Sequence, residues 1–233
     1  MNPIKQIIIL FLMLSLSHAG LNHPSNGQEL NYIYVLFEWD QEPDAVGYNL
    51  QASNMQQDII LDIEPQTTLY IDTNGQFNWD KNYRWRVRSK YIDGTYGQWI
   101  DTLMFKIKES VDISLNIDIF NNDLIQDGLY MYSQWIPFAA TVVIDKNGNE
   151  IWNNQGLFMN HVNQHGQLFG FNLMGIEFNY NNENLWTTPN EYSMDSHEFK
   201  QIPNGNYMGL DRVVQTGVIH PGEWTPLFQN LGY

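Results

Sequence analysis

A series of short turns in the second half of the chain constrains the fold more than any other feature. The segment Asp195–Leu210 holds two runs of alternating apolar residues on either side of a Pro-Asn-Gly-Asn turn at 203–206. Asn and Gly adopt positive φ at little cost, so an Asn-Gly turn between alternating segments predicts a β-hairpin. Similar hairpins precede it, with turns near Asn147-Gly148, His165-Gly166 and Asn181-Asn182.

Evenly repeated hairpins are typical of a β-propeller, in which two hairpins build one four-stranded blade. By this count residues 126–233 supply about two to three blades, whereas closed propellers typically have about four to eight. We therefore expect an all-β fold with a partial propeller over 126–233. We interpret the chain as the N-terminal portion of a longer protein.

Three motifs in this half carry a family resemblance. They are a V-x-I-D-x-N-G hairpin at 142–148, a G-I-E-F strand at 175–178 followed by Leu-Trp at 185–186, and the His197-x-Phe199 strand before the Pro-Asn-Gly-Asn turn. In these motifs the chain resembles the arylsulfotransferase (aryl sulfate sulfotransferase) family. The resemblance implies transfer of a sulfuryl group from an aryl sulfate to a phenol through a sulfohistidine. We expect no cofactor and no metal ion.

The same resemblance assigns one catalytic residue. His197 matches the family's early, sulfate-contacting histidine, while the nucleophilic histidine and its arginine lie in later blades, beyond Tyr233. Strand alternation puts His197 on the face opposite Ser196 and Glu198, so we expect it to face the propeller axis. A half-buried strand histidine bonded to a neighbouring blade is the structural alternative. The other histidines of this half are expected on surface loops: His161, His165 and His220.

Charge leaves a second function class open. A sulfate site needs convergent positive charge, and the residues from 126 onward contain few permanent cations: Lys146, Lys200 and Arg212. The alternative to an enzyme is a non-catalytic secreted binding or adhesion protein that uses both parts of the chain as scaffolds.

The first half, residues 20–110, consists of short alternating strands bounded by turn residues, a pattern typical of a β-sandwich. Its His-Pro-x-Asn-Gly motif at 23–27, Phe-Glu-Trp strand at 37–39, strand at 45–51 and Tyr-x-Trp-x-Val strand at 83–87 resemble a fibronectin type III domain. We expect seven strands, with a core that includes Trp39, Tyr48, Trp85 and Phe105.

The strand around Trp85 carries a row of cations on its opposite face: Arg84, Arg86, Arg88 and Lys90. We interpret the row as a solvated face that keeps the sheet soluble and guards it against edge pairing, screened by Asp40, Glu42 and Asp44. A cell-surface or polysaccharide partner for the sandwich is the alternative.

Residues 111–125 read as a connecting strand, because acidic residues alternate there with Val111 and the following apolar positions. We place the domain boundary near 110 and expect this strand to pack against the propeller or to bridge the two domains. Its aspartates lack the compact, Gly-containing spacing of a calcium loop, so no metal site is expected.

The N-terminus reads as a signal peptide over 1–19. Lys5 precedes an apolar run at 7–16 and the small-residue site Ser17-His18-Ala19. The run is shorter than the about 20 residues of a membrane span, so we expect export to the periplasm, the cell surface or the medium, without stable membrane insertion after cleavage.

The chain has no Cys, which excludes disulfides and thiolate metal sites. Its formal charge of −15 argues against nucleic acid or anionic lipid as partners.

Overall fold

The computed structural model describes residues 20–111, 121–135, 138–190 and 194–211, and the expected signal peptide lies outside them. The described regular elements are all β-strands apart from a 3-10 turn, η1 (Asn122–Leu124), which confirms the all-β class. Contacts group the chain into two compact units. One comprises the residues up to Met159 together with Asn179–Glu183, and the other comprises Asn160–Phe178 with the residues from Asn184 onward. Within the described residues, no helix has the length and apolarity needed to cross a bilayer.

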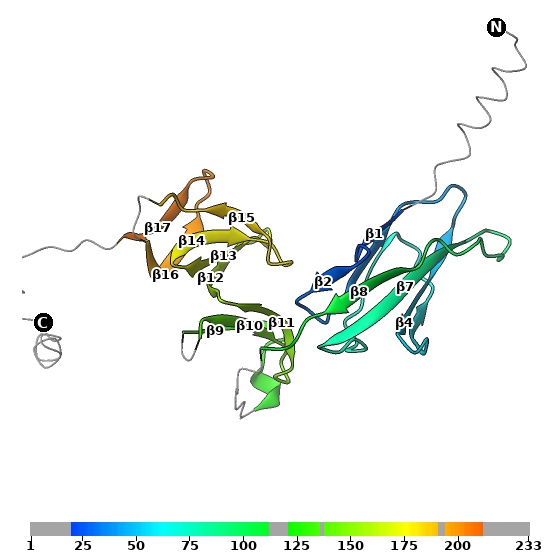
Figure 1. Cartoon of the computed structure of the whole chain (residues 1–233), viewed down its shortest axis with the longest axis horizontal. Coiled ribbons are helices and arrows are strands. Elements are labelled where there is room, and N and C mark those ends of the chain that lie inside the picture. Colours follow the sequence, from blue (N-terminus) through cyan, green and yellow to red (C-terminus); the bar gives the residue numbers. More distant parts are fainter. Residues whose placement is uncertain (1–19, 112–120, 136–137, 191–193, 212–233) are drawn as a thin grey trace, which may run out of the picture. The chain divides into compact units, whose positions relative to one another are not determined.

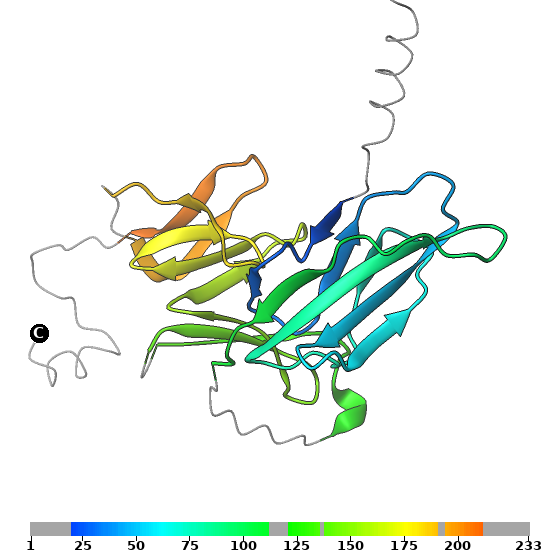
Figure 2. The same ribbon diagram turned by 45° about the vertical axis from the view of Figure 1, so that its right-hand side comes forward.

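Eight strands in two facing sheets form a β-sandwich in the first unit, drawn in blue to green in Figures 1 and 2. The smaller sheet has the order β1-β3-β6, with β1 (Leu21–His23), β3 (Leu36–Trp39) and β6 (Leu69–Ile71). The larger sheet has the order β2-β8-β7-β4-β5, with β2 (Gln28–Leu30), β8 (Leu103–Ile107), β7 (Lys81–Lys90), β4 (Gly47–Asn54) and β5 (Ile59–Ile63). Seven strands were expected; β2 has three residues, too few to show an alternating pattern, and it pairs in parallel with β8.

Aromatic side chains from both sheets fill the sandwich core. The four predicted core residues are confirmed, since Trp39 and Phe105 are 2% exposed and Tyr48 and Trp85 are 1% exposed. Phe37 of the smaller sheet joins the layers, with ring centroids 5.3 Å from Trp85 and 6.1 Å from Phe105. Burial of one such side chain is worth about 1.5–3 kcal/mol, so this cluster is a main source of stability.

A three-stranded sheet follows the sandwich in the same compact unit. It contains β9 (Tyr130–Gln134), β10 (Ala140–Ile144) and β11 (Glu150–Gln155), in the order β11-β10-β9. The predicted turn between β10 and β11 is confirmed, with Gly148 at φ 88°. Val111, the first residue of the expected connecting strand, packs against Ala140 and Val142; residues 112–120 lie outside the described part.

The segment that connects β2 and β3 of the sandwich pairs with the outer edge of β11. Tyr32 forms an isolated antiparallel bridge with Trp152, and the backbone N–H of Asn153 donates to the carbonyl of Asn31 at 2.9 Å. The Asn31 side-chain amide returns a bond of 2.8 Å to the Asn153 carbonyl. The sandwich and β9–β11 therefore share one compact unit, while the domain boundary near 110 stays a prediction.

The remaining strands form a four-stranded sheet and a hairpin. The sheet runs in chain order through β12 (Phe158–Val162), β13 (Leu168–Asn172), β14 (Met174–Phe178) and β15 (Asn184–Thr187), and the hairpin pairs β16 (Met194–Gln201) with β17 (Tyr207–Asp211). Positive φ angles at Gly166 (76°), Asn182 (64°) and Gly205 (85°) confirm the three predicted turns. Each of these sheets is open in the described residues, so the partial propeller over 126–233, and with it the interpretation as a portion of a longer protein, stays a prediction.

Candidate functional site

Strand β7 presents the cationic row on the outer face of the larger sandwich sheet. Its alternation is regular: from Tyr83 to Ser89 every second side chain is buried, and the residues between them are half-buried. Because neighbouring residues of a strand point to opposite faces, the buried Trp85 fixes Arg84 and Arg86 on the outer face. The face predicted for these arginines is confirmed.

Two of the three arginines are held in place by aromatic rings and amide side chains. Arg86 donates from Nε and Nη2 to Oε1 of Gln51, at 3.2 and 2.8 Å, and its Cζ lies 4.0 Å from the ring centre of Trp99. The Arg88 Cζ lies 4.3 Å from the ring centres of both Trp99 and Tyr96. Cation–π contacts and charged hydrogen bonds of this kind restrict the guanidinium groups without neutralising them.

Asn49 completes the support of Arg88, since its Oδ1 accepts a bond of 3.0 Å from Arg88 Nε. Asn49 and Gln51 lie opposite Arg88 and Arg86 in the β4–β7 register, so the ladder itself brings each amide to its guanidinium group.

Lys90, at the end of the row, is paired with an acid. Glu64 accepts hydrogen bonds from Lys90 and from the Tyr96 hydroxyl. The bond from Lys90 lowers the pKa of Glu64, and the same bond raises the pKa of Lys90. Asp40, one of the acids expected to screen the row, accepts bonds from the N–H of Gly20 and from the Asn22 amide, and its screening of the row stays a prediction.

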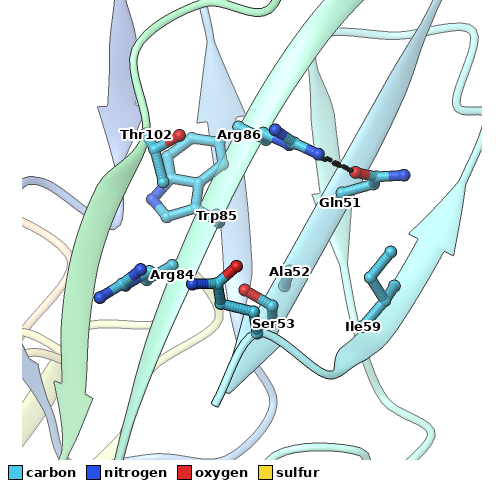
Figure 3. A pocket seen from close by; sticks show the side chains of 9 residues that line it. Gln51, Ala52, Ser53, Ile59, Arg84, Trp85, Arg86 and Thr102 are labelled. Carbon is cyan, nitrogen blue, oxygen red and sulfur yellow. Dashed lines mark hydrogen bonds between the residues drawn. The ribbon is translucent and has the colours of Figure 1, made fainter. Parts of the chain in front are cut away.

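A pocket of about 250 Å³ opens beside the unpaired arginine of the row (Figure 3). Arg84 and Arg86 line it, together with polar side chains that include Gln51, Ser53 and Thr102, and no acidic residue takes part. Among the described residues, the Arg84 guanidinium group has no hydrogen bond or ion pair. The pocket therefore presents positive charge from two arginines, of which Arg86 is bonded to Gln51.

The predicted catalytic residue lies in the other unit and is open to solvent. The His197 side chain is 82% exposed, and its Nδ1 contacts Oδ1 of Asp195, which also accepts the His197 backbone N–H at 2.9 Å. The β16–β17 register shifts between Met194 and Phe199, so simple alternation does not hold around His197. Its placement on a propeller axis stays a prediction.

The described structure brings no other predicted site residue to His197. Lys200 is paired with Glu198. The expected loop position of His161 is wrong, since it is half-buried in strand β12 and stacks on Phe169 with ring centroids 6.0 Å apart. His165 lies exposed in the β12–β13 turn, as expected. His220 and Arg212 lie outside the described residues. The described part also holds no group of three His, Cys, Asp or Glu side chains suited to a metal ion.

Strand alternation in the sequence does not identify the two aromatic rings that contact Arg86 and Arg88. Trp99 and Tyr96 lie in an irregular segment between β7 and β8, where no periodicity marks them. The available signal was the Tyr-x-x-Trp pair shortly after the Asp-Gly turn at 93–94, because chain reversal returns these rings to the strand that precedes the turn.

Comparison with known proteins adds little to this geometry. No protein-family model matches the chain, and no curated protein matches it. Among solved structures, it is similar to the fibronectin(III)-like modules of CbhA from Clostridium thermocellum, with a TM-score of 0.31 and 8% sequence identity over 73% of this chain and 90% of that one. The description of the sandwich depends on its own strand order and core.

Proposed function

We propose that this chain is an exported, non-catalytic binding protein whose sandwich recognises an acidic carbohydrate polymer through the arginine face of β7. By arginine face we mean the outer-face residues Arg84, Arg86, Arg88, Lys90, Tyr96 and Trp99. One observation carries the proposal: no described carboxylate forms an ion pair with any of the three arginines, in a chain whose formal charge is −15. Unpaired cations are unusual where acids outnumber bases 26 to 11.

The arginines keep most of their hydrogen-bonding capacity. A guanidinium group has about five N–H donors. Hydrogen bonds to side chains use two of these donors in Arg86, one in Arg88 and none in Arg84. The contacts to Trp99 and Tyr96 hold Arg86 and Arg88 in a fixed orientation. Binding to ordered donors costs less side-chain entropy than binding to mobile ones, which favours affinity.

The spacing of the row suits a sparsely charged polymer. Alternate residues of a strand lie about 6.8 Å apart, whereas duplex DNA carries one charge about every 1.7 Å and would meet the acidic remainder of the chain. A polysaccharide with one acid on some of its sugars presents fewer charges and many hydroxyl groups. In the same face, the amide groups of Asn49 and Gln51 donate to Asp62 and accept from Arg88 and Arg86, so they hold the arginines in place and leave ligand contacts to the remaining guanidinium N–H groups.

Binding to defined polymers tests the proposal. The chain without residues 1–19 is titrated with polygalacturonate, dextran sulfate and neutral dextran at low and high salt. We expect the two acidic polymers to bind at low salt, with affinity that falls as salt rises, and dextran not to bind.

A charge-matched pair of variants locates the interaction. Arg84→Gln/Arg88→Gln removes two cations from the arginine face, and Lys81→Gln/Lys146→Gln removes two from elsewhere. We expect the first double variant to lose binding and the second to retain it. Equal affinities in the two variants, or no binding of either acidic polymer at low salt, would rule out the proposal.

A second candidate is the sulfuryl transfer implied by the arylsulfotransferase resemblance, in a longer product of the gene. The observation that favours it is the contact between Asp195 and His197 Nδ1. A carboxylate accepts but does not donate, so Asp195 holds the ring with Nδ1–H toward itself and leaves Nε2 exposed. A histidine held in this way donates from Nε2 to a sulfate oxygen when its ring is protonated. Incubation of the full gene product with an aryl sulfate and a phenol tests this candidate, and absence of sulfated phenol excludes it.

A further inference from the structure

We propose that the pocket beside Arg84 binds a single tetrahedral oxyanion ester, a sulfate or phosphate group carried on a sugar. The inference rests on the proposed binding function and adds to it the chemical group that the sandwich selects. It assigns to Arg84 a role separate from that of the ordered Arg88, which provides general attraction for acidic polymers.

Donors reach the pocket from several chain segments. Arg84 and Arg86 come from β7, and Ser53 lies opposite Arg84 in the β4–β7 register. Gln57, from the β4–β5 turn, and Thr102, which precedes β8, complete the polar lining. Figure 3 shows Thr102 and Ser53 on different sides of the pocket and the bond that fixes Arg86 to Gln51.

This distribution of donors favours a tetrahedral group over a planar one. A carboxylate presents two oxygens in one plane and is satisfied by the fork of one arginine. A sulfate or phosphate ester presents three terminal oxygens in different directions, so it can accept from Arg84 and from the hydroxyl of Ser53, which lies opposite Arg84 in the register. The donor set has no acidic member that would repel such a group.

The size of the pocket limits the ligand to one substituent and part of its sugar. The volume of about 250 Å³ is below the roughly 300–1,000 Å³ of sites that enclose a drug-sized ligand. Ile59, which is 56% exposed, supplies an apolar wall against which the carbon atoms of a sugar ring can pack. The remainder of a polymer would then run along the outer face of β7.

Calorimetric titration with three monosaccharides tests the assignment. Glucose 6-sulfate and glucose 6-phosphate share the tetrahedral group, and glucuronate carries a planar carboxylate at a comparable position. We expect both esters to bind at least about tenfold more tightly than glucuronate, the difference that one additional charged hydrogen bond supplies.

A change of pH distinguishes the two esters. A phosphate ester gains its second negative charge at about pH 6, so it should bind more tightly above this pH, whereas a sulfate ester should bind equally above and below it. The only titratable groups that line the pocket are arginines, which stay charged on both sides of this pH.

Variants at Arg84 provide the structural control. Arg84→Gln should weaken ester binding by about tenfold or more, and Arg84→Lys should retain part of it, because lysine keeps the charge and loses the fork. Lys81→Gln, on the same strand but outside the pocket, should bind the esters as the parent chain does. Unchanged ester affinity in Arg84→Gln would overturn the assignment, as would glucuronate binding as tight as that of the esters. If Arg84→Gln shows no cooperative thermal transition, the Arg84→Lys variant is used in its place, and an ester affinity equal to that of the parent chain would overturn the assignment.

The two proposals fail in different ways. Binding of acidic polymers without measurable binding of either ester would overturn the pocket assignment and leave the proposed function in place. If the esters bind, Arg84→Gln abolishes that binding and no acidic polymer binds, the proposed polymer-binding function is wrong and the assignment of the pocket is kept.

Discussion

Substitution of Trp99 by alanine tests whether aromatic contacts order the arginine face. The ring lies 4.0 Å from Cζ of Arg86 and 4.3 Å from Cζ of Arg88. Each cation–π contact at a partly exposed site contributes about 0.5–1 kcal/mol, so Trp99→Ala should lower the free energy of unfolding by about 1–2 kcal/mol. For a unit of this size the melting temperature should fall by about 2–8 °C. Polymer affinity should fall as well, because the freed guanidinium groups lose their orientation.

A double-mutant cycle separates this effect from simple loss of packing. Urea unfolding of Trp99→Ala, Arg88→Gln and the combined variant should give a coupling energy of about 0.5–1 kcal/mol. The same cycle with Lys81→Gln in place of Arg88→Gln should give a coupling near zero, because Lys81 is not a partner of Trp99. Zero coupling between Trp99 and Arg88 would refute the view that the ring orders the arginines.

Three further predictions concern the second unit. Gly175→Ala should destabilise it by about 1–3 kcal/mol in urea unfolding, because a Cβ at this position lies 2.6 Å from the ring of Phe199; an unchanged midpoint would contradict this packing. His197→Ala should leave the unfolding free energy within about 0.5 kcal/mol, since the side chain is exposed, and should reduce sulfuryl transfer by about 10²–10³ in a longer product that has this activity; full activity would remove His197 from the site. Burial, and after it the hydrogen bond to Glu177, raise the pKa of Tyr207 to about 12, so its contribution to stability is present below pH 10.0 and is lost as the pH rises through 12. Tyr207→Phe should flatten that loss and remove one late step from the tyrosinate absorbance titration, and an unaltered titration would contradict the shift.

Local chemistry made the hairpins predictable. The turn at Gly148 joins strands only a few residues apart, so residue identity and alternation contain all the information needed. The cover over β11 was not predictable in the same way, since the contact between Asn31 and Asn153 spans 122 positions of the sequence. Neither asparagine belongs to a pattern that would identify the other as its partner.

The sequence predicted the sheet face on which the arginines lie, but it did not predict the side chains that contact them. Alternation around the buried Trp85 placed the arginines together on one face. Their interpretation as a merely solvated row depended on nearby acids, and the structure brings Trp99 and Tyr96 to Arg88 instead. Around His197, the register of the β16–β17 hairpin shifts, so the two-residue alternation from which we predicted the orientation of the His197 side chain does not hold there.

The contact between the sandwich and β11 has a consequence for how the protein is made. The segment around Asn31 leaves the ribosome long before β11, so a folded sandwich can offer its backbone groups to β11 as that strand emerges. Ile33 and Asn31 then satisfy the Ile151 carbonyl and the Asn153 N–H, which would otherwise form an open edge able to recruit strands of other molecules. The N-terminal sandwich thus closes one edge of the sheet that follows it, because its backbone groups occupy the positions at which a strand of another molecule would pair.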